Sequence, residues 1–216
     1  MTPDEGIDRV VVEHALEPRL RIVAISGPGE PLANDETFTT IQGVRNNLAE
    51  IQFCLSTNGT LLEESLNKLC DLNVSTVSVS MSTQNYSIAA RLYEWAEIDG
   101  LVLRGREMGR EIVTRQLNGI QSATDAGICV KVNTILIPQL NEDDMEPLSK
   151  CISDAGAQLQ NIVPLVSYGK AINLRPPSTS ELALARESAS KNIEQFMHCK
   201  QCRSDVIGIP GKDRVL

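Results

Sequence analysis

The sequence predicts an α/β fold in which parallel strands alternate with helices. Two observations predict it. Short apolar runs rich in β-branched residues recur along the chain, at positions 21–26, 51–56, 74–81, 128–136 and 159–165. Such runs, bounded by turn residues, are typical of strands. Two of the intervening segments, 61–70 and 112–120, carry apolar residues at helical spacing. Because strand and helix follow one another repeatedly, we expect the strands to be parallel neighbours in one sheet.

Size and charge narrow the class of protein further. The chain has 216 residues, of which 42% are hydrophobic and 22% charged, and this is enough to bury the core of a single domain spanning 1–216. The formal net charge of -8 opposes non-specific attraction to nucleic acid or to anionic lipid. The sequence carries no basic and apolar leader and no long apolar run. We therefore expect a cytoplasmic protein whose partners are small molecules, metals or other proteins.

Three polar residues mark expected helix starts. Thr2 is followed by a proline and two acidic residues, the usual sequence of a capped first turn. Asn141 precedes three acidic residues, and Ser180 precedes Glu181, which repeats this arrangement. Residues 171–179 contain two prolines and are predicted to form a loop before the last helix. Since the chain opens on a helix, we expect a βα barrel or sheet without its first strand and the loop that follows it.

The ends of the predicted strands carry polar and glycine-rich segments. In parallel βα folds the functional groups lie on the loops that follow the carboxyl ends of the strands. In this sequence these segments are 26–31, 54–59, 78–82, 131–134 and 164–166. Candidate binding residues are therefore expected at one edge of the sheet.

Six cysteines have to be interpreted individually, as core residues, ligands or reactive thiols. Cys70, Cys129 and Cys151 lie among apolar neighbours of expected helices and a strand, so we predict that they belong to the core. Cys54 ends an apolar strand and could be either a small buried residue or a ligand. The pair Cys199 and Cys202 could bind zinc, form a redox pair or ligate an iron-sulfur cluster.

Four segments, in this order, carry a family resemblance. The first reads Ser-Gly-Pro-Gly-Glu-Pro-Leu-Ala-Asn and resembles the segment by which radical S-adenosylmethionine enzymes hold the methionine amino group. It is most similar to the version found in the NifB family of nitrogenase cofactor maturases. Three further segments resemble the same family in the same order. The four segments are 26–34, 54–59, 130–138 and 198–205.

The resemblance implies a partial TIM-barrel fold of the radical S-adenosylmethionine type, without its first strand and cysteine loop. It also implies residues that contact S-adenosylmethionine. The glycines allow close backbone approach, and an acidic side chain suits an ammonium group. The implied contacts are Gly27, Gly29, Glu30, Ser80, Val132 and the neighbouring Asn133. Without the other segments, Gly27 and Gly29 would be interpreted as a simple strand-to-helix turn.

The family pattern also implies ligands for substrate iron-sulfur clusters. Cys54 matches a cysteine that helps to hold one substrate [4Fe-4S] cluster, and Cys199 and Cys202 match the pair that helps to hold the other. The pair lies in an expected cluster-binding tail that starts at about residue 196. Members of the family insert a carbide from the methyl group of S-adenosylmethionine and fuse the two clusters into the eight-iron precursor of the iron-molybdenum cofactor. Nitrogenase cofactor assembly proteins are the implied partners.

One part of the family pattern is missing from this sequence. The family carries a Cys-x-x-x-Cys-x-x-Cys loop, which binds the cluster that cleaves S-adenosylmethionine, and this sequence contains no such motif. In the family, a helix start like the one at Thr2 follows that loop, so we expect Met1 to be internal to a longer reading frame. The chain as written is expected to make no radical. Two alternatives are a non-catalytic iron-sulfur scaffold and a degenerate fragment.

Overall fold

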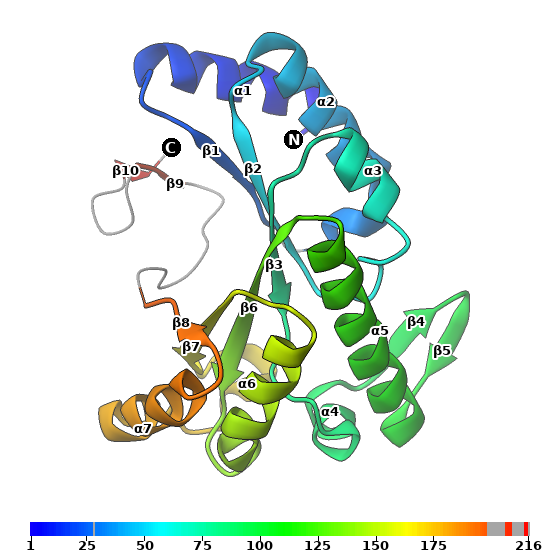
Figure 1. The fold of residues 1–216 in the computed structure, drawn as a ribbon, viewed down its shortest axis with the longest axis vertical. Helices are drawn as coiled ribbons and strands as arrows, with labels where there is room; N and C mark the ends of the chain where they lie inside the picture. The colour runs from blue at the N-terminus through cyan, green and yellow to red at the C-terminus, as the bar shows by residue number, and fades with distance from the viewer. Residues whose placement is uncertain (28, 198–205, 209–213, 216) are drawn as a thin grey trace.

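The computed structural model describes the whole chain except residues 28, 198–205, 209–213 and 216. Its centre is one sheet of six parallel strands in the order β1-β2-β3-β6-β7-β8 (Figure 1). The strands are β1 (Ile22–Ile25), β2 (Gln52–Thr57), β3 (Thr76–Ser80), β6 (Cys129–Leu136), β7 (Leu159–Pro164) and β8 (Glu194–Gln195). All five strands expected from the sequence are confirmed, each within two residues of its predicted ends.

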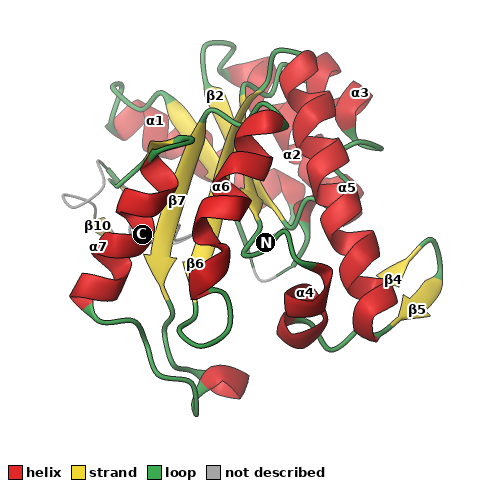
Figure 2. Cartoon of the chain, turned by 60° about the horizontal axis from the view of Figure 1, so that its bottom comes forward, coloured by secondary structure: helices red, strands yellow, loops and turns green. Residues whose placement is uncertain are grey.

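Seven helices accompany this sheet in the described part of the chain. They are α1 (Pro3–Leu16), α2 (Asp35–Asn47), α3 (Leu66–Asp71), α4 (Tyr86–Leu92), α5 (Gly105–Asp125), α6 (Met145–Asp154) and α7 (Thr179–Ser190). Short 3₁₀ turns are η1 (Pro31–Ala33), η2 (Glu142–Asp144) and η3 (Gly169–Ala171). Figure 2 shows α5, α6 and α7 side by side over one face of the sheet. No helix of the described residues is long and apolar enough to cross a membrane.

Two antiparallel strand pairs were not predicted. One is formed by β4 (Ala96–Ile98) and β5 (Leu101–Leu103), which project beside α5 (Figure 1). The other is formed by β9 (Val206–Ile207) and β10 (Arg214–Val215). These strands are two or three residues long, too short for an alternating pattern to be recognised in the sequence.

The sheet has two chemically different faces, because successive side chains of a strand point to opposite sides. One set is apolar and is buried against the helices; Phe53, Leu55, Val77, Val79 and Val130 are each at most 1% exposed. The other set forms what we call the polar face: Cys54, Ser56, Ser78, Ser80, Lys131, Asn133 and Asn161. The main core therefore lies between the sheet and the helices, and a smaller apolar cluster is formed by Ile98, Met108 and Ile112.

The barrel is partial, as predicted, and is not closed in the described part of the chain. β1 and β8 form the two edges of the six-stranded sheet and do not pair with each other. The radical S-adenosylmethionine-like arrangement of parallel βα units is present, and the sheet opens at β1, where the sequence predicted that a strand is missing. Ile22 of β1 is accordingly 62% exposed.

The three predicted helix starts have different outcomes. Thr2 is confirmed: its hydroxyl accepts a hydrogen bond from the backbone N–H of Glu5, whose carboxylate accepts one from the Thr2 N–H. The prediction at Ser180 is wrong by two residues, because Ser178 is the residue that caps α7. Asn141 does not cap a helix with its side chain, which bonds to the backbone of neighbouring strand ends.

The predicted core cysteines are also only partly correct. Cys70 is exposed, because α3 buries Leu69 and its next residue faces solvent. Cys129 is half buried and alternates with the core residue Val130, so it shares the face of Cys54. Cys151 is half buried on α6, and burial raises the pKa of its thiol, which keeps it protonated.

Candidate functional site

The loop that follows β1 is open above two glycines. A Cβ atom added to Gly27 or Gly29 would meet no atom within 4 Å. The φ angle of Gly27 also lies outside the left-handed region. Packing therefore does not require glycine at either position, and the backbone at this strand end is accessible to a ligand.

Glu30 ties this loop to the end of the next strand. One oxygen of its carboxylate accepts hydrogen bonds from the Thr57 hydroxyl at 2.6 Å and from the Leu32 N–H at 3.1 Å. The other oxygen accepts from the Asn58 N–H at 2.7 Å. The sequence predicted an acidic group beside a ligand ammonium. The structure adds that these bonds hold Glu30 in a defined position at the carboxyl ends of β1 and β2.

Ser80 and Asn133 form a second group, one strand further along the sheet. Ser80 is the exposed last residue of β3, and Asn133 lies directly opposite it in β6. The Asn161 side chain of β7 donates a hydrogen bond to the Asn133 side-chain oxygen at 3.3 Å. The three residues occupy one row of the polar face.

Val132 lies on the other face of the sheet. Its side chain is fully buried in the core under the helices. The side-chain position therefore separates Val132 from Ser80 and Asn133, and a contact with a ligand would have to come from its backbone.

A buried glutamine that was not predicted joins the two groups. Gln116 of α5 is 2% exposed, and its amide nitrogen donates to the carbonyl of Asn58 at 2.7 Å and to that of Ser80 at 3.0 Å. The sequence did contain a signal for it. Gln116 is a polar residue within an otherwise apolar stripe of the predicted helix, where a polar group needs a buried partner.

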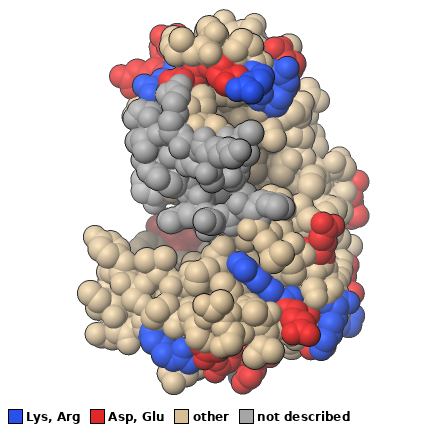
Figure 3. Space-filling view, turned by 90° about the vertical axis from the view of Figure 1, so that its left-hand side faces the viewer, with Lys and Arg blue, Asp and Glu red and all other residues tan. Residues whose placement is uncertain are grey.

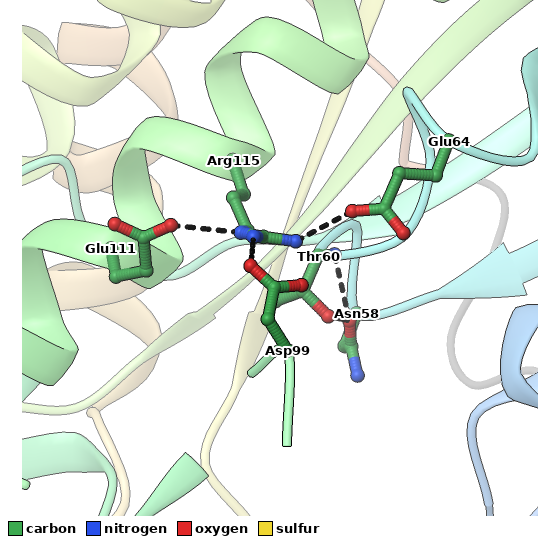
Figure 4. A network of polar contacts seen from close by, with 6 residues as sticks. All are labelled: Asn58, Thr60, Glu64, Asp99, Glu111 and Arg115. Atoms are coloured by element: carbon green, nitrogen blue, oxygen red, sulfur yellow. Dashed lines mark hydrogen bonds and ion pairs between the residues drawn. The ribbon is translucent and has the colours of Figure 1, made fainter. Parts of the chain in front are cut away.

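The outer side of the loop between β2 and α3 is held by Arg115 (Figure 4). Its guanidinium contacts Glu64 of this loop at 2.7 Å, Glu111 of α5 at 2.8 Å and Asp99 at the turn of the β4–β5 pair. Glu111, with Asp99 and Glu64, raises the pKa of Arg115. In the same loop the side-chain oxygen of Asn58 accepts from Thr60.

A thiol, a hydroxyl and a lysine lie on neighbouring strands of the polar face. The Cys54 sulfur is 3.5 Å from the Ser78 hydroxyl, and Ser78 lies directly opposite Lys131 in the neighbouring strand. Lys131 is only 7% exposed, and its ammonium lies 5.4 Å from the centre of the Phe196 ring. Lysine is seldom buried to this extent. Cys129 shares the face, in the same row as Cys54.

The metal ligands expected from the sequence are only partly placed. Cys54 is half buried on the polar face. Cys199 and Cys202, with His198, lie outside the described residues. Among the residues that are described, no three His, Cys, Asp or Glu side chains come together as a metal site.

The surface seen in Figure 3 mixes acidic and basic side chains. They gather mainly at the top and bottom of the molecule, and the coloured residues form no continuous basic stripe. On this face the described acidic and basic side chains are therefore interspersed.

Comparison with known proteins identifies the family. The model of the "Radical SAM superfamily" matches residues 1–152. The chain is 37% identical, over 99% of its length, to "FeMo cofactor biosynthesis protein NifB" of Klebsiella pneumoniae, and covers 47% of that protein. It is 38% identical, over 92% of its length, to the protein of the same name from Methanocaldococcus jannaschii, and covers 66% of it. The chain thus spans from about half to two thirds of these relatives.

Solved structures agree on the fold. A radical SAM methyltransferase from Sphaerobacter thermophilus superposes with a TM-score of 0.72 at 17% identity, over 99% of this chain and 62% of that one. Streptococcus suis SuiB gives 0.66 at 13% identity, over 94% of this chain and 44% of that one. On the family match and these relatives together, the chain belongs to the radical SAM superfamily and is related along nearly its whole length to NifB proteins.

Proposed function

We propose that this chain forms the part of a nitrogenase iron-molybdenum cofactor maturase that holds S-adenosylmethionine and the substrate clusters. The reaction it would serve is the insertion of a carbide during fusion of two [4Fe-4S] clusters into the eight-iron precursor. The observation that carries the proposal is the open Gly27 and Gly29 backbone next to the fixed Glu30 carboxylate. The relationship to NifB proteins supplies the reaction class.

The S-adenosylmethionine part rests on the strand ends. The exposed backbone of Gly27 and Gly29 offers hydrogen-bonding groups to the methionine moiety, and Glu30 offers an anion to its ammonium. Ser80 and Asn133 offer further polar groups at β3 and β6, next to the end of β2 that Asn58 follows. The residues present therefore fit S-adenosylmethionine.

The substrate-cluster part rests on Cys54 and on the tail. Cys54 supplies one thiolate from the polar face, and Cys199 and Cys202 supply two more. The buried Lys131 ammonium shares the face of Cys54 and suits the negative charge of a thiolate-ligated cluster. As part of this proposal we assign the protein to the cytoplasm, where thiols stay reduced, and nitrogenase cofactor assembly proteins to its partners.

The cluster that would cleave S-adenosylmethionine is a different case. The sequence contains no Cys-x-x-x-Cys-x-x-Cys motif, and the described cysteines lie on separate elements and belong to no group of three or more potential ligands. The residues present do not fit this cluster. We therefore assign no radical step to this polypeptide by itself, and its cysteine motif would have to come from outside the 216 residues.

The proposal is tested by anaerobic reconstitution of the purified chain with iron and sulfide. We expect about four iron atoms per bound cluster, measured by iron analysis and visible absorption. S-adenosylmethionine binding is measured by isothermal titration. Cys54→Ser and the double variant C199S/C202S should each lower the iron content. Cys70→Ser is the matched control, because Cys70 is exposed on α3 and should leave the iron content unchanged.

The outcomes separate the competing functions. Iron and S-adenosylmethionine binding without 5′-deoxyadenosine formation supports the proposal. Iron binding without S-adenosylmethionine binding would favour the second candidate, an iron-sulfur scaffold. The thiols on the polar face support this candidate. Reductive cleavage of S-adenosylmethionine by this chain alone would contradict the assignment of the missing cluster, and loss of both bindings would contradict the whole proposal.

A further inference from the structure

Gln116 lies between the two groups of candidate S-adenosylmethionine contacts. It is a polar residue, yet it is only 2% exposed, because α5 packs it against the sheet. Its amide nitrogen reaches one carbonyl past the end of β2 and one at the end of β3. A buried amide that donates to two backbone carbonyls of different segments is well placed to hold the strand ends at a fixed separation.

This contact depends on an unusually close approach of α5 to the loop after β2. A Cβ atom on Gly59 would lie 2.7 Å from a methyl of Val79 and 3.2 Å from the Gln116 side chain. A Cβ atom on Gly119 would lie 2.8 Å from Leu62 and 3.3 Å from the Gly59 carbonyl oxygen. All four distances are shorter than ordinary van der Waals contacts. The two glycines thus allow the helix to come near enough for Gln116 to reach the backbone of both strands.

The hydrogen bonds form a continuous chain across three strand ends. Glu30, after β1, accepts from the Asn58 N–H; the Asn58 carbonyl accepts from Gln116; and Gln116 also donates to the Ser80 carbonyl. Every bond in this chain is 3.0 Å or shorter. The position of Glu30 relative to Ser80 is therefore determined through Gln116.

We infer that Gln116 is a positioning residue of the S-adenosylmethionine site, which it supports without touching the ligand. The inference rests on the proposed function, because it concerns the same site. An amide is required, since two carbonyl oxygens need two N–H donors from one side chain. A carboxylate would oppose both carbonyls, and an apolar side chain would leave them without this donor.

The test compares two buried glutamines in the full chain. Gln116→Met keeps the length of the side chain and removes the donor. Gln160→Met is the matched control: Gln160 is fully buried and bonds to Thr134, Ser149 and Gln195, near the amino end of β7. The measurements are the S-adenosylmethionine dissociation constant by isothermal titration, the melting temperature, and amide hydrogen exchange of residues 57–60 and 80–83.

We expect both variants to lose stability and only Gln116→Met to lose affinity. The expected loss is about tenfold or more, the range that a supporting hydrogen bond contributes at metal sites. Amide hydrogen exchange of residues 57–60 and 80–83 should become faster in Gln116→Met and not in Gln160→Met. If Gln116→Met does not fold, Gln116→Asn, which withdraws the amide by one methylene, provides the same comparison.

The failures are distinguishable. Unchanged affinity in Gln116→Met, or an equal loss in Gln160→Met, would overturn the inference and leave the proposed function standing. Absence of S-adenosylmethionine binding by the unaltered chain would overturn both.

Discussion

At the scale of single residues, short-range hydrogen bonds decide what the polar side chains do. The start of α7 is an example, because Ser178 and Ser180 are equally good caps by residue type. In the structure Ser178 caps, and the Glu181 carboxylate accepts from the Ser178 N–H at 2.7 Å and from Arg175. The Arg175 side chain and the Ser178 N–H lower the pKa of Glu181 to about 2. A charged capping group therefore stabilises this helix start.

This lowered pKa predicts a pH dependence of stability. In the folded chain the pKa of Glu181 is below its ordinary value of 4.5. Its contribution to the free energy of unfolding is therefore fully present above about pH 4.5. It is lost as the pH falls from about 4.5 towards about 2. Urea unfolding at several pH values measures the free energy of unfolding. Over this pH window it should decline less in Glu181→Gln than in the unaltered chain. An identical decline in both proteins would contradict the assignment.

At the scale of elements, the packing of α5 determines the shape of the candidate site. The helix carries Gln116 on its inner side and Arg115 on its outer side, and both residues contact the loop between β2 and α3. The apolar stripe of this helix was recognisable in the sequence, and so was the glycine after Asn58. The closeness of the two segments was not, because it depends on which loop the helix crosses. No local pattern encodes that distance.

Two glycines with the same φ angle test this packing. Gly59 and Gly127 both have a φ of +83°, but a Cβ on Gly127 would meet no atom within 4 Å. Gly127→Ala should therefore cost about 1–2 kcal/mol of unfolding free energy from backbone strain alone. Gly59→Ala should cost about 1–3 kcal/mol more, because its Cβ overlaps Val79 and Gln116. Chemical denaturation measures both, and equal losses would show that the close approach does not matter.

At the scale of the whole molecule, the sheet separates the apolar core from the face that carries the proposed site. The core lies on its helix-covered face, while thiols, hydroxyls, amides and Lys131 lie on the polar face. Residues that are neighbours on one strand therefore lie in different environments. Cys129 illustrates the consequence, because it was predicted to be core from its apolar neighbours and instead shares a row with Cys54.

The separation predicts a large and a small loss of stability for substitutions at two residues of β2. Phe53 is 1% exposed in the core, so Phe53→Ala should lower the free energy of unfolding by about 3–5 kcal/mol. Ser56 lies on the polar face, and Ser56→Ala should stay within about 0.5 kcal/mol of the unaltered chain. Urea denaturation of the two variants checks this. A large loss for Ser56→Ala would mean that the polar face carries part of the core.

The sequence by itself determined the order of strands and helices, the parallel sheet and the loops in which candidate ligands lie, because hydrophobic periodicity and turn residues are local properties. It also determined the family, through the segments around Gly27, Cys54 and Asn133. Only the tertiary structure decided that Val132 faces the core, that Lys131 is buried beside the row of Cys54, and that Gln116 joins two strand ends. These features arise from contacts between segments far apart in the chain, and such contacts leave no periodic signal in the residues between them.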